Sequence, residues 1–203
     1  MGHYTGPKAR INRRLGAMIF ESNDARKAFE RRSDGMPGMH PRRGKLSDYG
    51  KGMLEKQKIK HFYGLGERQL RRLYQDAMRR PGNIGENLLI MCELRFDNIV
   101  RRGGLTATRP QARQGIGHGH FLINGMKCDV ASRLLKPGEM VHVKARGPLQ
   151  QLYGGSLQTT EIELPAFLRF DASRLTIHIE RAPVPDEISL SVNIGAVIEL
   201  LSR

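Results

Sequence analysis

The sequence predicts an α+β fold, in which a helical domain is joined to a domain of antiparallel strands and helices. Three observations predict it. Apolar residues recur at helical spacing between Ser47 and Val100, short apolar runs bounded by turn residues follow between 120 and 179, and Asn124-Gly125 separates two of these runs as a two-residue hairpin turn. At 203 residues, 39% of them hydrophobic, the chain is long enough to bury a core.

The charge is large and unevenly distributed. The formal net charge is +14. Residues 1–60 hold 15 Lys and Arg against 6 Asp and Glu, residues 61–155 hold 15 against 7, and residues 156–203 hold 4 against 7. Because like charges at this density repel one another, the first three quarters of the chain are expected to meet a polyanion. Nucleic acid is the first candidate, and an acidic membrane surface is the second.

Residues 1–45 are predicted to form an extended basic arm with one short helix near Asn23–Arg32. Glycines and prolines interrupt the segment, and it offers little apolar surface to offset the loss of chain entropy. A poorly ordered solubilising tail is the alternative interpretation.

Residues 46–93 are predicted to form the helical domain. Ser47 can cap a first helix that Gly64 and Gly66 end, and the apolar face of a second helix follows. The other side of this second helix carries a basic stripe made of Arg68, Arg71, Arg72 and Arg79. Such a stripe is usually a solvated face, but four arginines with few matching acids favour a phosphate-binding surface. A third helix is predicted from the capping pair Asn83 and Glu86 to the run 101–104.

Residues 94–183 are predicted to form the mixed domain, which begins with a basic, glycine-rich stretch. Thr108 and Gln111 fit a capping box, so a short helix should start there and end at the glycines 115, 117 and 119. Arg109 and Arg113 are four residues apart and share a face of it. Strands are expected at 120–123, 127–130, 140–143, 167–170 and 175–179, and a short helix at 148–157. The apolar end of the chain, within a tail of about 184–203, is expected to pack back on the helical domain.

The residue types in this stretch suit contact with nucleic acid. Arginine forks match phosphate oxygens and stack on bases. Glycines let backbone N–H groups approach phosphates, and His118 and His120 can donate to phosphate or 2′-hydroxyl groups. Helix capping is the alternative role for the two arginines, although Arg109 stands at a helix N-terminus, where the helix dipole opposes a cation.

Three segments carry a resemblance to a known family. They are DNIVRRGGLTATRPQARQGIGHGHFLING (97–125), KLSDYGKGMLEKQKIKHFYGLGERQLRRLYQDAMRR (45–80) and NIGENLLIMCELRFDNIV (83–100). The first resembles the small RNA-binding module named after the bacterial small-ribosomal-subunit protein four, and the other two resemble the body of that family. The resemblance extends over about 38–146 and 4–14, and VNIGAVIELLSR resembles the end of a family member. The combination of SDYG, GENLL and TR-x-x-AR is more specific than the module alone, which several enzymes share.

The resemblance implies a structural protein that binds small-subunit ribosomal RNA directly and early in assembly. It implies a place beside neighbouring small-subunit proteins, near the channel through which mRNA enters, and hence in the cytoplasm. The module is expected at about 94–156. The RNA contacts that the matching positions imply there are Arg109, Arg113, Gln114, His118, His120, Asn124 and Lys127. In the arm they are Arg10, Arg13, Arg14, Arg42, Arg43 and Lys45.

An enzyme is the main rival class, because pseudouridine synthases and some tRNA synthetases carry this module. Arg95-Phe96-Asp97 resembles the motif around a pseudouridine synthase's catalytic aspartate, but Asp97 falls in a predicted amphipathic helix and little chain remains for a catalytic domain. A structural or RNA-facing role is therefore expected for Asp97. An RNA binder or translational repressor that acts off the ribosome remains the other alternative.

No cofactor, metal or membrane span is expected. His118-x-His120 lacks nearby residues that would complete a metal site, and the spacing of glycines 115–119 is not that of a dinucleotide fingerprint. Cys92 and Cys128 are 36 residues apart without a C-x-x-C motif, which suits reduced, packed thiols. Some relatives hold zinc with four cysteines near the N-terminus, whereas this chain has none before Cys92, so its arm is expected to be metal-free. The sequence has neither an 18-residue apolar run nor a secretion signal.

Overall fold

The computed structural model describes residues 4–20, 22–31, 36–38, 44–158 and 164–202. They belong to two compact units. The helical unit consists of residues 1–85 and 190–203, and the sheet unit consists of residues 86–189. The limits expected for the arm, the helical domain and the mixed domain as functional parts stay predictions.

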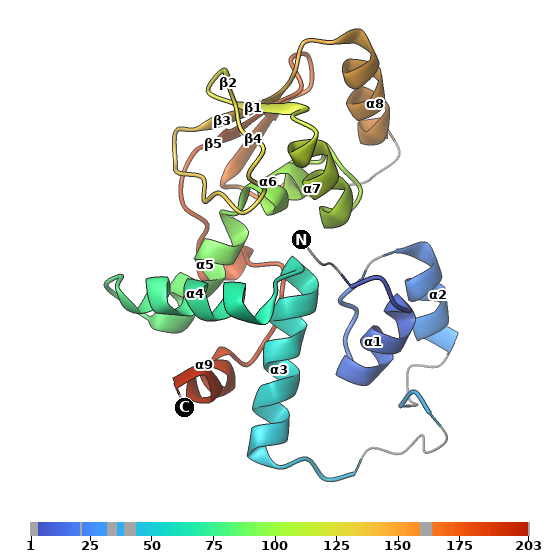
Figure 1. The fold of residues 1–203 in the computed structure, drawn as a ribbon, viewed down its shortest axis with the longest axis vertical. Helices are drawn as coiled ribbons and strands as arrows, with labels where there is room; N and C mark the ends of the chain where they lie inside the picture. Colours follow the sequence, from blue (N-terminus) through green and yellow to red (C-terminus); the bar gives the residue numbers. More distant parts are fainter. Residues whose placement is uncertain (1–3, 21, 32–35, 39–43, 159–163, 203) are drawn as a thin grey trace. The chain divides into compact units, whose positions relative to one another are not determined.

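The helical unit holds five helices within its described residues (Figure 1). They are α1 (Lys8–Leu15), α2 (Asn23–Arg31), α3 (Asp48–Tyr63), α4 (Glu67–Met78) and α9 (Ile194–Ser202). The predicted start of α3 is confirmed, because the Ser47 hydroxyl accepts a hydrogen bond from the Gly50 N–H at 3.2 Å. Its predicted end is confirmed too, since Gly64 adopts the left-handed conformation with φ 60°.

Helix α9 lies against α3 at a glycine. A Cβ atom at Gly52 would stand only 3.0 Å from the Ala196 carbonyl oxygen, so the absence of a side chain allows the two helices to approach. The backbone N–H of Asn193 also donates to Glu55 Oε2 at 3.0 Å. The end of the chain thus covers one face of the long helix.

The described part of residues 1–45 contains two helices and is not extended throughout. Helix α2 matches the short helix that the sequence predicted, but α1 was not predicted. The buried side chain of Asn12 holds the turn after α1, because its Oδ1 accepts from the N–H groups of Ile19 and Phe20 at 3.1 and 3.0 Å. Four apolar side chains here are buried and supply more core than composition indicated: Ile11, Leu15, Ile19 and Ala25.

The sheet unit combines a five-stranded antiparallel sheet with helices. Its helices are α5, which begins just before the unit (Ile84–Glu93), α6 (Phe96–Arg102), α7 (Arg109–Gly117) and α8 (Gly147–Gln158). Its strands are β1 (Phe121–Ile123), β2 (Met126–Lys127), β3 (Met140–Val143), β4 (Leu168–Asp171) and β5 (Thr176–Ile179), in the spatial order β2-β1-β3-β5-β4. A short 3₁₀ helix, η1, spans Pro185–Glu187.

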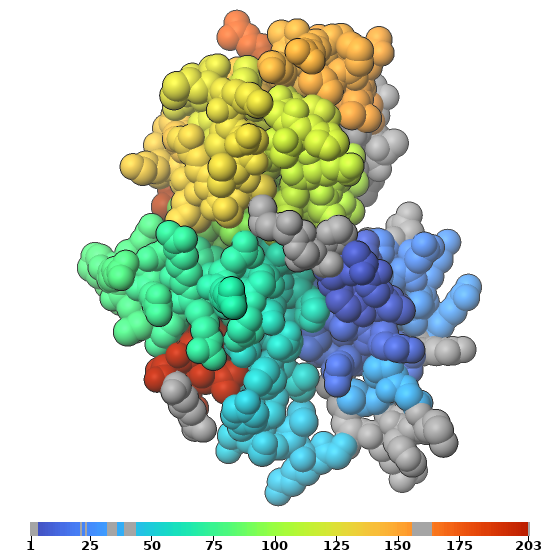
Figure 2. Space-filling model, in the orientation of Figure 1, coloured from blue at the N-terminus to red at the C-terminus, as the bar shows by residue number. Residues whose placement is uncertain are grey.

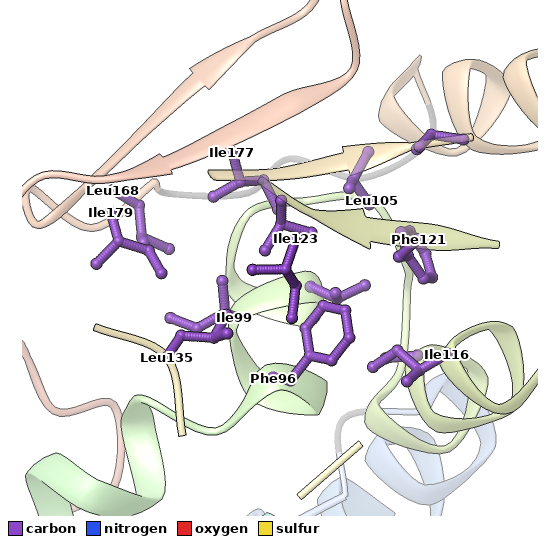
Figure 3. Close-up of a cluster of buried hydrophobic side chains, with 14 of the residues drawn as sticks. Phe96, Ile99, Leu105, Ile116, Phe121, Ile123, Leu135, Leu168, Ile177 and Ile179 are labelled. Atoms are coloured by element: carbon purple, nitrogen blue, oxygen red, sulfur yellow. The ribbon is translucent and has the colours of Figure 1, made fainter. Parts of the chain in front are cut away.

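The core of the sheet unit lies between one face of the sheet and helices α6 and α7 (Figure 3). Ile123 and Ile177 point from the strands toward Phe96 and Ile99 of α6, while Ile116 of α7 closes the cluster beside them. All five side chains are at most 1% exposed. This packing fixes the position of α7 and therefore the backbone positions from which its arginine side chains extend.

Two elements of the sheet unit differ from the sequence prediction. The single helix predicted over 83–100 is two helices, because the chain pairs with another segment at Leu94–Phe96. The Phe96 N–H donates to the Arg133 carbonyl at 2.8 Å, and the Leu135 N–H donates to the Leu94 carbonyl at 2.8 Å. The return strand predicted at 127–130 is wrong in extent, since β2 has only two residues.

Candidate nucleic-acid interface

Helix α7 begins where its capping residues predicted. The Thr108 hydroxyl accepts from the Gln111 N–H at 3.4 Å, whereas the Gln111 side chain accepts from the Ala107 N–H at 3.1 Å rather than from that of Thr108. The helix passes through Gly115 and ends at Gly117, so only the later glycines end it. Thr108 therefore fixes the start of the helix that carries Arg109 and Arg113.

Arg109 and Arg113 are both attached to α6 through their Nε atoms. Arg109 Nε donates to Asn98 Oδ1 at 2.9 Å, and Arg113 Nε donates to Asp97 Oδ2 at 2.6 Å. Two consecutive residues of α6 thus hold two arginines that stand one turn apart on α7. The Arg113 side chain keeps 16% of its surface exposed, while that of Asp97 keeps 1%.

The two acceptors are themselves fixed by buried groups. Arg95 makes a two-point contact with Asp97, with Nε 3.1 Å from Oδ1 and Nη2 2.8 Å from Oδ2. Asn98 Nδ2 donates to the Glu93 backbone carbonyl at 2.9 Å and to Glu93 Oε2 at 2.7 Å. Glu93 and Asn98 are fully buried, and Arg95 is 3% exposed. The arginines of α7 are therefore attached to a rigid, hydrogen-bonded interior.

His118 and His120 differ in environment. His118 is exposed, whereas His120 is partly buried and its Nδ1 lies 2.8 Å from the Tyr153 hydroxyl. The rings of His118, His120 and Tyr153 meet edge to face in succession, with centroids 5.5 and 5.9 Å apart. Burial, followed by electrostatic repulsion from His118 and Arg146, lowers the pKa of His120. His120 is thus neutral at pH 7, and it offers a hydrogen bond or a ring face rather than a charge.

Tyr153 was not predicted as part of the site, although it positions His120 from α8. It is 2% exposed, and a Cβ atom on Gly115 would come within 2.4 Å of its hydroxyl oxygen, so a glycine is needed where α7 passes it. The sequence carried no spacing that links residues 115, 120 and 153. Only the folded sheet unit brings them together.

The hairpin after His120 has the predicted turn. Asn124 and Gly125 both have positive φ, 48° and 82°, as a two-residue turn of this kind requires. Asn124 is tied to β3, because its Oδ1 accepts from the Met140 N–H at 2.8 Å. Lys127 is exposed, and its aliphatic stem passes over Gly119. Gln114, on α7, is exposed as well.

The cations predicted in the helical unit stand mostly at its surface. Arg68, Arg71 and Arg72 are exposed on α4, which is drawn in blue-green in Figure 2. In the arm, Arg13 donates to the Met36 carbonyl at 3.1 Å. The remaining described arm cations are exposed: Arg10, Arg14 and Lys45. Arg42 and Arg43 lie outside the described residues.

Comparisons with known proteins find relatives that match the whole length of the chain. Residues 3–93 match the family described as the ribosomal protein S4/S9 N-terminal domain, and residues 94–141 match the S4 domain. The small ribosomal subunit protein uS4 of Rhodopirellula baltica is 49% identical over 203 residues, which cover all of both chains. The proteins of the same name from Rubrobacter xylanophilus and Herpetosiphon aurantiacus are 41% and 38% identical, again over the full length of both. The chain belongs to the uS4 family.

The uS4 family match agrees with the resemblance that the sequence motifs carried. The S4 domain match spans the helix α7, the His118–His120 segment and the first hairpin, so every residue proposed as an RNA contact in the sheet unit falls within it. The proposed contacts of the helical unit fall within the other match.

Asp97 lies in the interior of this uS4 family chain, and the structural or RNA-facing role expected for it stays a prediction. Its carboxylate is buried and is bonded to Arg95 and Arg113. Cys92 is fully buried, and burial raises the pKa of its thiol to about 12. In the described part of the chain, no three His, Cys, Asp or Glu residues gather as metal ligands would, and no helix has the length and apolar character to cross a bilayer.

Proposed function

We propose that this protein is a structural component of the small ribosomal subunit, which works in the cytoplasm and binds small-subunit ribosomal RNA directly. The observation that carries the proposal is the full-length identity of 49% to a protein named small ribosomal subunit protein uS4. The net charge of +14 supports it, because like charges at this density repel one another and attract a polyanion such as RNA.

Two surfaces are proposed to contact the RNA. The first is the α7 surface of the sheet unit, made of Arg109, Arg113, Gln114, His118, His120, Asn124 and Lys127. The second is the set of cations on the helical unit, made of Arg10, Arg13, Arg14, Lys45, Arg68, Arg71 and Arg72, together with Arg42 and Arg43. The first combines arginine forks, ring faces and an exposed amide, which suit an RNA whose bases are partly accessible. The second offers charge alone and suits the phosphate backbone.

The finer parts of the proposal follow from the family. We propose that binding occurs early in subunit assembly, and that the protein also meets neighbouring subunit proteins and mRNA near the channel through which mRNA enters. A two-part basic protein that contacts several RNA helices at once is suited to an early step, because it joins segments that are distant in the RNA sequence.

The experiment compares affinity for the five-prime domain of small-subunit ribosomal RNA with affinity for an unrelated structured RNA of equal length, across a salt series. A preference that survives moderate salt is expected, because shape and base contacts persist when counterion release is screened. Equal affinities that collapse together with salt would contradict a specific ribosomal role and would favour an RNA binder that acts off the ribosome. The matched control is a variant with Arg68, Arg71 and Arg72 all changed to Gln, which should lose affinity for both RNAs alike.

A further inference from the structure

Two adjacent side chains of α6 hold the two arginines of α7 in a paired arrangement. Asp97 accepts from Arg113, and Asn98 accepts from Arg109, in both cases at Nε. Arg109 and Arg113 are four residues apart, so they lie about 6 Å apart along the axis of α7. The acceptors are buried, and the arginines reach the surface.

The direction of each contact is determined by a third group. Because Glu93 takes both hydrogen bonds that Asn98 Nδ2 donates, the Asn98 amide cannot flip, and its Oδ1 is kept for Arg109. Asp97 is likewise held by the two-point contact with Arg95. Arg95 alone already compensates the charge of Asp97, so folding needs no second arginine on that carboxylate.

An anchored Nε fixes the plane of a guanidinium group. The group is planar, and its terminal Nη donors lie at the end remote from the Cδ–Nε bond. A free arginine loses side-chain entropy when it binds a phosphate, whereas an arginine that is already ordered loses less. Anchoring therefore raises affinity without adding any contact to the ligand.

We propose that Asp97 and Asn98 are positioning residues for RNA binding, which hold Arg113 and Arg109 in register for the phosphate oxygens of one RNA segment. The inference rests on the proposed function, since it assumes that the α7 surface binds RNA. Neither buried residue touches the RNA, and each affects affinity through the arginine that it holds.

The sign of one substitution separates positioning from simple electrostatics. Asp97→Asn removes a negative charge near the bound RNA, so charge alone predicts tighter binding. Positioning predicts the opposite, a loss of about three- to tenfold, because Arg113 is then held less firmly before the RNA binds. The control is Asp76→Asn, which removes the partly exposed α4 carboxylate that pairs with Arg79 and should leave affinity unchanged or raise it.

A double-mutant cycle makes the test specific to Arg113. Asp97→Asn, Arg113→Gln and the double variant are titrated with the five-prime domain RNA, and each is checked for cooperative unfolding. The inference expects Asp97→Asn to weaken binding in the wild-type background and to add little once Arg113 is Gln. Equal losses in both backgrounds, or tighter binding of folded Asp97→Asn protein, would overturn it.

A second variant covers the case in which Asp97→Asn does not fold. Arg109→Lys keeps the charge but has no Nε to reach Asn98, whereas Arg72→Lys makes the same change at an exposed position of α4. Arg109→Lys is expected to lose several-fold more affinity than Arg72→Lys, and equal effects would refute positioning.

If the wild-type protein shows no preference for ribosomal RNA, the proposed function fails. If it shows the preference and these variants match their controls, only the positioning inference fails.

Discussion

The sheet unit and the helical unit present arginine in different ways. On α7, Arg109 and Arg113 are partly exposed side chains whose Nε atoms donate to buried acceptors of α6. In the helical unit, Arg71 of α4 and Arg79, which follows the last residue of α4, pair with Glu67 and Asp76 of that helix at 3.8 and 3.3 Å, and their side chains stay 71% and 79% exposed. The arginines of the two units thus differ: those of α7 are held by the fold, whereas those at the surface of α4 can adapt to a ligand.

The difference has a physical consequence for recognition. A fixed guanidinium can reward one arrangement of acceptors and reject others, whereas a mobile one gains similar energy from any phosphate within reach. We therefore expect specificity to depend mainly on the sheet unit, and we expect salt-dependent affinity to depend on both.

The largest expected effect is on the stability of the sheet unit. Asp97→Ala leaves the buried Arg95 without its carboxylate, which should lower the free energy of unfolding by about 3–5 kcal/mol. Asp76→Ala removes the partly exposed carboxylate that pairs with Arg79 and should cost less than about 1 kcal/mol. Denaturant unfolding followed by circular dichroism measures both, and similar losses for the two variants would remove the distinction between the units.

The next effect is acid sensitivity in the helical unit, where the carboxylate of Glu67 accepts hydrogen bonds from two lysines. Burial opposes ionisation of Glu67, but hydrogen bonds from Lys56 and Lys60, both at 2.8 Å, outweigh it and lower the pKa of Glu67 to about 2. A lowered carboxyl pKa contributes stability above the ordinary value of 4.5, and this contribution is lost as the pH falls from 4.5 toward 2.

Because Glu67 is partly solvated, the contribution is on the order of 1 kcal/mol after screening. The variant Glu67→Gln should be less stable than the wild-type protein at pH 7 and should lose less of its stability between pH 4.5 and 2. The test is a series of unfolding curves across that range. Parallel pH profiles for the two proteins would show that the lysines do not stabilise the ionised form.

The contrast between the units also marks what the sequence could predict. Local signals did well: the Ser47 and Thr108 caps, the Asn124-Gly125 turn and the strand Met140–Val143 are set by residues within a few positions of one another. The family was recognisable because its motifs are contiguous. The stripe on α4 was readable because helical periodicity alone decides which side of that helix is polar.

Contacts between distant residues could not be read in this way. The break between α5 and α6 depends on backbone hydrogen bonds to residues 133–135, and no local residue signals it. The buried role of Asn12 and the contact of Tyr153 with His120 depend on tertiary packing in the same way. The family resemblance implied Arg113 as an RNA contact, but its Nε bond to Asp97, 16 residues away, appears only in the fold. Charge reversal there would therefore report on folding as well as on RNA.

A smaller effect is expected from the exposed arginines, and it concerns binding alone. Arg72→Gln should reduce the slope of log affinity against log salt by about 0.7–0.9 and should weaken binding to related and unrelated RNA alike, because one phosphate contact is lost. Its free energy of unfolding should stay within about 0.5 kcal/mol of the wild-type value, as expected for an exposed side chain. Filter binding across a salt series provides the slope, and an unchanged slope would remove Arg72 from the interface.

The smallest effect is expected at His120, where the sheet unit uses a neutral group. Burial first, and then electrostatic repulsion from His118 and Arg146, lower the pKa of His120 below its ordinary value of 6.5, while Tyr153 holds its Nδ1. The unfolded chain therefore binds a proton more readily than the folded one, and stability should fall slightly as the pH drops below 6.5. In His120→Gln this fall should shrink. The matched control is His61→Gln, which removes a histidine of similarly lowered pKa from the helical unit.

Because His120 brings no charge to the RNA at pH 7, His120→Gln should weaken binding without changing the salt slope, in contrast to Arg72→Gln. A slope reduced to the same extent in both variants would mean that His120 binds phosphate as a cation, and that the neutral, anchored character assigned to this surface is wrong.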